Sequence, residues 1–274
     1  PIRIWTPRAD SFKRKKSAAA ALLKNKKNVL KKIWRRWRAR VFLSRLQNRL
    51  LKRAKTGLFM NKLIIFDFDG VLIDSELLGC QVWSDCLKPY ADVSLQAMLG
   101  YTGRTGALIC KMIEEEYHCT LPSDFLAHVN TAVEDLMERE LLPVKGVLET
   151  LPKLALPMCI ASGSRPERLF QCLRVAHLES FFNKSNTFSS HYVKNGKPAP
   201  DIFLYAAEKM GESPENCVVI EDSVSGIVGA KAAKMTVFGF AGGSHCAPDH
   251  AEKLTAAGAD LTFDDFTKLP DLLG

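Results

Sequence analysis

The sequence predicts an α/β fold, with a three-layer core around a central parallel sheet and a small helical domain inserted into that core. Short apolar runs alternate along the chain with patterns at helical spacing, which is the order expected when helices connect parallel strands. One long stretch interrupts this alternation with helical patterns only. We therefore expect a core that is split in the sequence by a helical insertion.

The predicted strands are short and apolar throughout, as strands buried on both faces are. The first of them runs directly into the letters DFDG, as expected of a buried strand that enters a loop. The predicted strands span 63–66, 157–161, 217–220 and 236–240, and the helices between them span 165–175, 202–210 and 225–233.

The helical insertion is predicted over residues 77–149, where helical patterns such as 107–117 and 124–140 occur without a convincing strand. Pro143 and Gly146 mark its return to the core. We therefore expect a cap domain over 77–149 and a catalytic core made of 60–76 and 150–274.

The composition is that of a soluble globular protein, with 274 residues, 47% apolar and 25% charged. No apolar run reaches the ~18 residues that a membrane span needs, which excludes an integral membrane protein. The eight cysteines form no C-x-x-C pair, and this favours free thiols in a reducing compartment. We therefore expect a cytoplasmic protein, and a monomer.

The charge of the chain is divided unevenly. Residues 1–60 hold 20 Lys and Arg against one acid, Asp10, a charge of +19. Residues 61–274 hold 18 basic and 29 acidic residues, a charge of −11, and the two parts together give the net charge of +8. The globular core is therefore not expected to bind nucleic acid, and the basic excess belongs to the N-terminal arm.

The basic arm, residues 1–59, has the pattern of a long amphipathic helix over 17–54. Three interpretations stay open. The arm contacts an anionic membrane or nucleic acid, as basic amphipathic helices do, or it is a targeting segment. Alternatively it is a non-native or upstream extension without function, because Met60 stands directly before the first strand.

Two acids, Asp67 and Asp69, follow the first strand. In extended chain this spacing places both carboxylates on one side, about 7 Å apart along the backbone. Open α/β sheets bind ligands beyond the carboxyl ends of their strands. The pair is therefore a candidate site, although Asp residues after a strand also cap helices.

Four segments in order resemble the signatures of the haloacid dehalogenase superfamily, and together they cover essentially all of residues 60–274. They are DFDGVLIDS at 67–75, IASGS at 160–164, GKPAPD at 196–201 and IEDSVSG at 220–226. The resemblance implies a Rossmann-like core with a cap, and phosphoryl transfer assisted by Mg²⁺. Within the superfamily the chain is most similar to the β-phosphoglucomutase-like branch, which includes phosphatases of sugar phosphates and of 6-phosphogluconate.

The first signature implies the central chemistry. Asp67 would attack phosphorus and form an aspartyl phosphate, which divides one difficult displacement into two easier steps. Asp69 would protonate the leaving alcohol and then deprotonate water, and its backbone carbonyl would join Asp67 in binding the metal. Gly70 would let the chain turn close to the phosphate.

The other three signatures imply the remaining roles. Ser162 would donate its hydroxyl to the phosphoryl group, and Gly163 and Ser164 would lie beside the substrate. Lys197 would offset the negative charge and keep Asp67 ionised. Asp222 would complete the Mg²⁺ shell, with Glu221 as a direct ligand or a partner of the ligands.

Among the reactions of the superfamily, the sequence favours phosphatase activity on a small phosphorylated metabolite. Dehalogenases lack an acid at the position of Asp69. β-Phosphoglucomutase carries a histidine at the position of Gly79, so a mutase is the second hypothesis. A factor that acts through the basic arm is a third hypothesis, of another class.

Three further segments contain residues that could bind a ligand or cap a helix. The turn at 100–105 is expected to form the specificity loop of the cap, in which Gly103 permits a tight turn and Arg104 binds an anionic or hydroxyl-rich group. His245, Cys246 and His250 lack a fourth ligand at a telling distance, which disfavours a zinc site. The acids at 260, 264 and 265 are expected at the surface or at helix starts.

Overall fold

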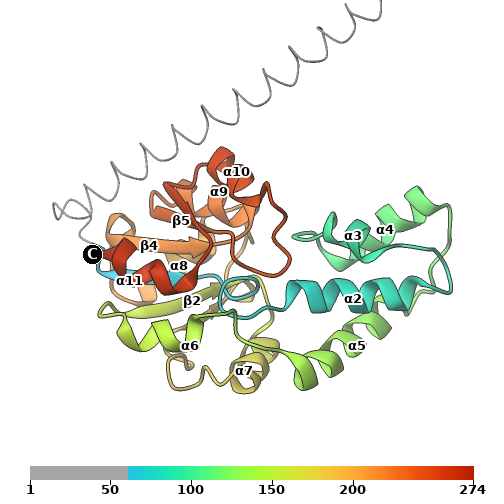
Figure 1. Cartoon of the computed structure of the whole chain (residues 1–274), viewed down its shortest axis with the longest axis horizontal. Coiled ribbons are helices and arrows are strands. Elements are labelled where there is room, and N and C mark those ends of the chain that lie inside the picture. Colours follow the sequence, from blue (N-terminus) through green and yellow to red (C-terminus); the bar gives the residue numbers. More distant parts are fainter. Residues whose placement is uncertain (1–60) are drawn as a thin grey trace, which may run out of the picture. The chain divides into compact units, whose positions relative to one another are not determined.

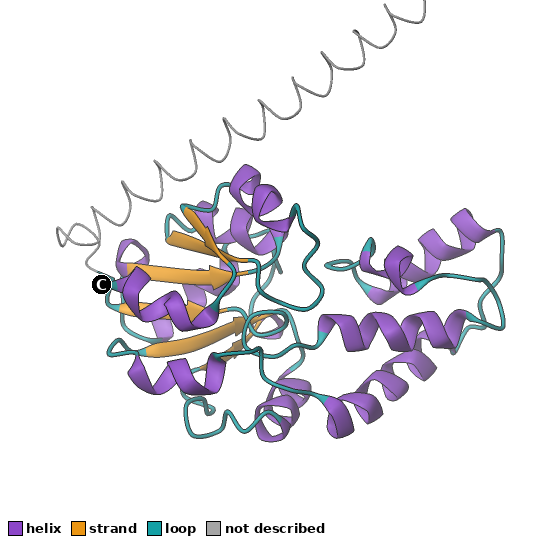
Figure 2. Cartoon of the chain, viewed as in Figure 1, coloured by secondary structure: helices purple, strands orange, loops and turns teal. Residues whose placement is uncertain are grey.

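The computed structural model describes residues 61–274, so the predicted basic arm lies outside the described residues. A parallel six-stranded sheet forms the centre of this part, with helices on both of its faces (Figure 2). The strand order is β3-β2-β1-β4-β5-β6. The strands are β1 Leu63–Phe66, β2 Met158–Ser162, β3 Thr187–Ser189, β4 Cys217–Glu221, β5 Thr236–Phe240 and β6 Leu261–Phe263.

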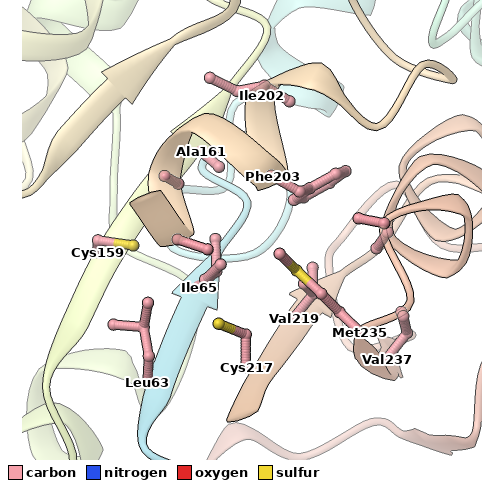
Figure 3. Packing of buried hydrophobic residues seen from close by; sticks show 14 of the residues in the cluster. Leu63, Ile65, Cys159, Ala161, Ile202, Phe203, Cys217, Val219, Met235 and Val237 are labelled. Atoms are coloured by element: carbon pink, nitrogen blue, oxygen red, sulfur yellow. The ribbon is translucent and has the colours of Figure 1, made fainter. Parts of the chain in front are cut away.

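The two faces of β1 illustrate how the sheet is covered. Leu63 and Ile65 point to one face, where they pack with Phe203 of α8 (Asp201–Lys209) in a large hydrophobic cluster (Figure 3). Phe66 points to the other face, where its ring stacks on Phe266 at a centroid distance of 6.0 Å. Each fully buried side chain of this size contributes about 1.5–3 kcal/mol, so the doubly covered sheet holds the core together.

The helical segments around the sheet follow the strands that they connect. No helix within residues 61–274 combines the length and the apolar character that crossing a membrane requires. The helices of the core are α6 Val147–Thr150, α7 Pro166–Val175, α8 Asp201–Lys209, α9 Val224–Ala232, α10 His250–Ala257 and α11 Leu269–Leu273, with short 3-10 turns η1 Leu151–Lys153, η2 Ser190–Tyr192, η3 Pro214–Asn216 and η4 Phe266–Lys268.

Four further helices lie beyond the end of the sheet toward which the strand arrows point (Figure 1). They pack around a hydrophobic cluster of their own, separate from that of the core. The chain enters these helices through residues 72–74 and leaves them through residues 142–144. The two segments lie side by side, because Asp74 N donates to Leu142 O and Val144 N donates to Leu72 O, both at 3.0 Å. These helices are α2 Glu76–Leu87, α3 Leu95–Leu99, α4 Gly106–Tyr117 and α5 Phe125–Glu140.

The predicted α/β class, with its parallel sheet, is confirmed, and the four predicted strands lie within one residue of their observed bounds. The sequence missed β3 and β6, since three residues at a sheet edge carry too little periodic signal. The predicted end of the cap, residues 147–149, lies in α6, which packs on the η4 turn. Asp265 begins η4 as expected, but Asp260 accepts a hydrogen bond from Val237 N at 2.8 Å and so anchors β5.

The strand order reverses at the centre of the sheet, where β1 pairs with β2 on one side and with β4 on the other. Loops leave the carboxyl ends of β1 and β4 in opposite directions at such a point, and the crevice between them is where open parallel sheets bind ligands. The acids of the first and of the fourth signature segment, 67–75 and 220–226, lie at the ends of these two strands.

Candidate active site

Three buried carboxylates meet at the crevice between β1 and β4. Asp67 follows β1, Glu221 ends β4, and Asp222 follows β4. One carboxylate oxygen from each lies within 4.8 Å of the other two. All three residues are less than 10% exposed, so the cluster is built into the protein rather than spread on its surface.

Lys197 provides the positive charge of this cluster. Its Nζ lies 2.8 Å from Asp67 Oδ1 and 2.8 Å from Glu221 Oε2. The other oxygen of Glu221 accepts hydrogen bonds from Ser223 N at 3.1 Å and from Ser223 Oγ at 2.6 Å. Both oxygens of Glu221 therefore have protein donors, and this residue positions Lys197 beside Asp67.

The cluster has more negative than positive charge. Burial and the neighbouring Glu221 raise the pKa of Asp67 well above its usual range, although Lys197 opposes them. Three buried carboxylates face Lys197 and the imidazole of His245, which leaves an excess of negative charge, and the atoms available to bind a metal ion are hard carboxylate oxygens. These residues fit a magnesium ion, which binds carboxylate oxygens and keeps several waters.

Gly70 lets the first motif approach this cluster. Its φ of +78° lies in the left-handed region, which favours glycine. A Cβ at this position would overlap the carboxylate of Asp222 and lie 2.9 Å from His245 Cε1. Any other residue would therefore strain the turn and displace Asp222.

Asp69 has partners of its own. Arg168 donates through Nη1 to Oδ2 at 2.9 Å and through Nη2 to Oδ1 at 2.7 Å, and Ser75 and Ser164 donate their hydroxyls to the same carboxylate. The carboxylates of Asp67 and Asp69 take different partners, Lys197 for Asp67 and Arg168 with the two serines for Asp69. β1 ends at Phe66, so the alternation of an extended strand does not apply to the residues after it.

The environment of Asp69 keeps its carboxylate ionised. Burial raises the pKa of Asp69, but the guanidinium of Arg168 and the two hydroxyl donors outweigh burial and lower it to about 2. Arg168 also lies 3.3 Å from Met137 Sδ, near the end of α5. One side chain thus contacts both Asp69 and the helical insertion.

Ser162 ends β2 and is buried, with only 1% of its surface exposed. Its Oγ accepts a hydrogen bond from Ser164 N at 3.0 Å, which leaves the hydroxyl proton for a ligand. Gly163 between them is exposed, and nothing lies within 4 Å of the position that its Cβ would occupy. The second motif therefore presents a hydroxyl and an uncovered turn at the end of its strand.

The sequence and this geometry agree with the comparison to known families. The family model of haloacid dehalogenase-like hydrolases matches residues 61–234. The chain belongs to the haloacid dehalogenase-like hydrolases.

Curated relatives of this hydrolase include two enzymes of Escherichia coli (strain K12). The 6-phosphogluconate phosphatase is 27% identical over 213 residues, 76% of this chain and 93% of that protein. The fructose-1-phosphate phosphatase is 33% identical over 176 residues, 63% of this chain and 92% of that protein. Among solved structures, a haloacid dehalogenase-like protein of Agrobacterium tumefaciens is 38% identical with a TM-score of 0.73, and covers 78% of this chain and 97% of its own.

In this hydrolase the predicted specificity loop, residues 100–105, forms a turn with a hydrogen bond inside it. Gly103 adopts a φ of +78°, as the predicted tight turn requires. Arg104 is exposed, and its Nη1 donates to Gly100 O at 2.6 Å within the same loop. Its predicted role toward substrate stays a prediction.

His245, Cys246 and His250 come together in the hydrolase, with their ligand atoms within 4.8 Å of one another. His245 Nε2 lies 3.0 Å from Asp222 Oδ2, and His250 Nε2 lies 2.7 Å from Asp222 O. The Nε2 atom of each histidine thus faces an oxygen of Asp222, which ties this group to the acidic cluster.

The sequence did not identify Arg168 or assign His245 to the acidic cluster. Arg168 lies four residues after Ser164 and donates to its hydroxyl at 2.5 Å, so helical spacing could have found it. His245 lies far along the chain from the first motif, and only the folding of its loop over the sheet brings it to Asp222.

Proposed function

We propose that this hydrolase is a Mg²⁺-dependent phosphatase that acts on a small phosphorylated metabolite, a sugar phosphate or a sugar-acid phosphate. The observation that carries the proposal is the buried cluster of Asp67, Lys197, Glu221 and Asp222 at the reversal of strand order. The named activities of its relatives, on 6-phosphogluconate and fructose 1-phosphate, support this substrate class.

The proposed first step is attack by Asp67 on phosphorus, with release of the alcohol and formation of an aspartyl phosphate. Mg²⁺, when bound to Asp67, Asp222 and the backbone carbonyl of Asp69, would neutralise phosphate charge. Lys197 holds Asp67 at 2.8 Å and favours its ionised form against the effect of burial. Ser162 donates its remaining proton to a phosphoryl oxygen.

The proposed second step is hydrolysis of the aspartyl phosphate, with Asp69 as the base that takes a proton from water. Asp69 first has to protonate the leaving alcohol, which an ionised carboxylate paired with Arg168 does not do. We therefore propose that Asp69 leaves Arg168 before the first step and takes up a proton from solvent, which it gives to the leaving alcohol oxygen and regains from the attacking water. The contact of Arg168 with Met137 supports a link between this change and movement of the helical insertion.

Substrate choice is assigned to the helical insertion, residues 77–149, acting as a cap. Its loop at 100–105 carries Arg104, which would bind a second anionic or hydroxyl-rich group of the substrate. Closure over the crevice would exclude water during the first step, and opening would admit it for the second.

A β-phosphoglucomutase-like mutase is the alternative, and Gly79 disfavours it. This residue lies in α2 and has no side chain where those mutases carry a histidine. A mutase must keep its aspartyl phosphate intact until it has phosphorylated the intermediate again. A phosphatase only has to let water hydrolyse it.

The test is phosphate release from a panel of phosphorylated sugars and sugar acids, with Mg²⁺ or with EDTA, for the wild type and for Asp67→Asn. We expect release that needs Mg²⁺, is concentrated on a few substrates, and is lost in Asp67→Asn while the protein stays folded. Release by Asp67→Asn at the wild-type rate would reject the nucleophile. Conversion of β-glucose 1-phosphate with a bisphosphate activator, without net release, would favour the mutase.

A further inference from the structure

The loop between β5 and α10, residues 241–249, returns to the acidic cluster. None of the four signature segments includes it. Ser244 attaches it to the first motif, because its N and its Oγ both donate to Asp74 Oδ1, at 3.1 and 2.7 Å. The loop thereby connects the end of the first motif with the end of β4.

His245 is the side chain through which the loop reaches the cluster. Its Nε2 lies 3.0 Å from Asp222 Oδ2, and the two side chains are only 7% and 6% exposed. An ionised carboxylate only accepts hydrogen bonds, so Nε2 carries the proton and donates it. Oδ2 of Asp222 accepts this hydrogen bond, whereas Oδ1 has no such donor among the described residues.

The imidazole of His245 lies between two glycines, Gly70 in the first motif and Gly243 in the loop itself. A Cβ on Gly243 would lie 2.7 Å from His245 Cε1 and 2.8 Å from Nδ1. A Cβ on Gly70 would lie 2.9 Å from the same Cε1. The ring therefore fits between two backbones that approach it closely, and this fixes the direction in which Nε2 points.

The backbone of Asp222 is held from the same side. His250, the first residue of α10, lies with Nε2 at 2.7 Å from Asp222 O. A carbonyl oxygen accepts, so this nitrogen donates as well. Two histidines five residues apart therefore restrain the side chain and the backbone of one acidic residue.

We propose that His245 is a positioning residue, which orients the Asp222 carboxylate so that its free oxygen faces the metal position. The proposal rests on the proposed function, in which Asp222 binds Mg²⁺. His245 is not expected to touch substrate or metal. Hydrogen-bond partners behind a metal ligand typically change metal affinity by about 10–100-fold when they are removed.

The experiment compares Mg²⁺ binding by the full chain and its variants, using calorimetric titration of the metal-free proteins with MgCl₂. His245→Ala removes the donor, and His245→Gln restores an N–H donor of similar reach. His191→Ala, at an exposed histidine, is the matched control. Cys246→Ala removes the third group of the His–Cys–His cluster and leaves both hydrogen bonds to Asp222.

We expect the dissociation constant for Mg²⁺ to rise about 10–100-fold in His245→Ala. His245→Gln should recover most of this loss, and His191→Ala and Cys246→Ala should match the wild type. The Mg²⁺ concentration for half-maximal phosphate release should rise in parallel, while KM at saturating Mg²⁺ changes little. A merely structural role would alter stability and KM without this selective loss of metal affinity.

Two outcomes would overturn the proposal. One is wild-type Mg²⁺ affinity in folded His245→Ala, and the other is an equal loss in Cys246→Ala, which would identify a metal site of the whole cluster instead. If His245→Ala does not fold, His245→Gln and His245→Asn decide, because only the amide with the longer reach should retain affinity. A wild type that binds no Mg²⁺ would reject the proposed function itself, which distinguishes the two failures.

Discussion

The guanidinium of Arg168 and the carboxylate of Asp69 form two parallel hydrogen bonds, at 2.9 and 2.7 Å, between α7 and the loop after β1. Paired geometry of this kind is stronger than a single contact and specific for arginine. Both side chains are 18% exposed, so little solvent screens the pair. Asp69, the residue proposed as acid and base, is thus held in its ionised form by Arg168.

Arg168→Met should lower the free energy of unfolding by about 2–4 kcal/mol, because it leaves a nearly buried carboxylate without its cation. Urea unfolding at neutral pH measures this loss. Arg174→Met in the same helix is the control, since Arg174 is 62% exposed and its pair with Glu138 should contribute at most about 1 kcal/mol. Equal losses in the two variants would contradict the importance of the Asp69 pair.

Lys197→Met should reduce turnover at least ~100-fold at saturating Mg²⁺, because Asp67 and Glu221 then face each other without a cation. The exposed Lys194, three residues earlier, provides the matched variant Lys194→Met, which should keep wild-type turnover. Initial rates of phosphate release measure both. Circular dichroism confirms that the variants are folded, and a folded Lys197→Met with normal turnover would exclude the proposed role.

Deprotonation of Glu76 should lower the free energy of unfolding of the metal-free protein as the pH rises. Burial, and then the charges of Asp69 and Asp222, raise the pKa of Glu76 from 4.5 to about 7. The folded state therefore favours the protonated form, so the stability present below pH 4.5 is lost as the pH rises toward 7.

Glu76→Gln should consequently unfold like the wild type at pH 4 and be more stable by about 1–3 kcal/mol at pH 8. Urea unfolding in EDTA at the two pH values measures the difference. Glu149→Gln, at an exposed position of α6, should stay within about 0.5 kcal/mol of the wild type at both. A gain by Glu76→Gln that is equal at pH 4 and pH 8 would show that charge is not its cause.

Two glycines should respond in opposite directions to alanine. A Cβ on Gly226 would overlap the carboxylate of Glu221, which is fully buried and held by Lys197 and Ser223. Gly226→Ala should therefore lower Tm and turnover together. Gly79 in α2 has no atom within 4 Å of its Cβ position, so Gly79→Ala should gain about 0.5–1 kcal/mol from helix propensity. Thermal unfolding of both variants checks the contrast.

Elements with strong local signals could be predicted from the residues alone. β1 and β4 are continuous apolar runs that end in acids, so their type and the position of Asp67, Glu221 and Asp222 at strand ends follow from the letters. The helices α4 and α5 were predicted for the same reason, since their apolar spacing extends over several turns. The four motifs in order also sufficed for the family, which the comparison then showed.

The partner of each polar group, in contrast, depends on how distant segments pack together. Asp69 pairs with Arg168, 99 residues away, and Asp222 with His245 on a loop that no motif includes. The edge strands β3 and β6 likewise exist only because a neighbouring strand offers its backbone. The physical reason is common to all of them: local propensity depends on residues a few positions apart, whereas buried hydrogen bonds and ion pairs depend on which distant segments the packed sheet brings within 3 Å.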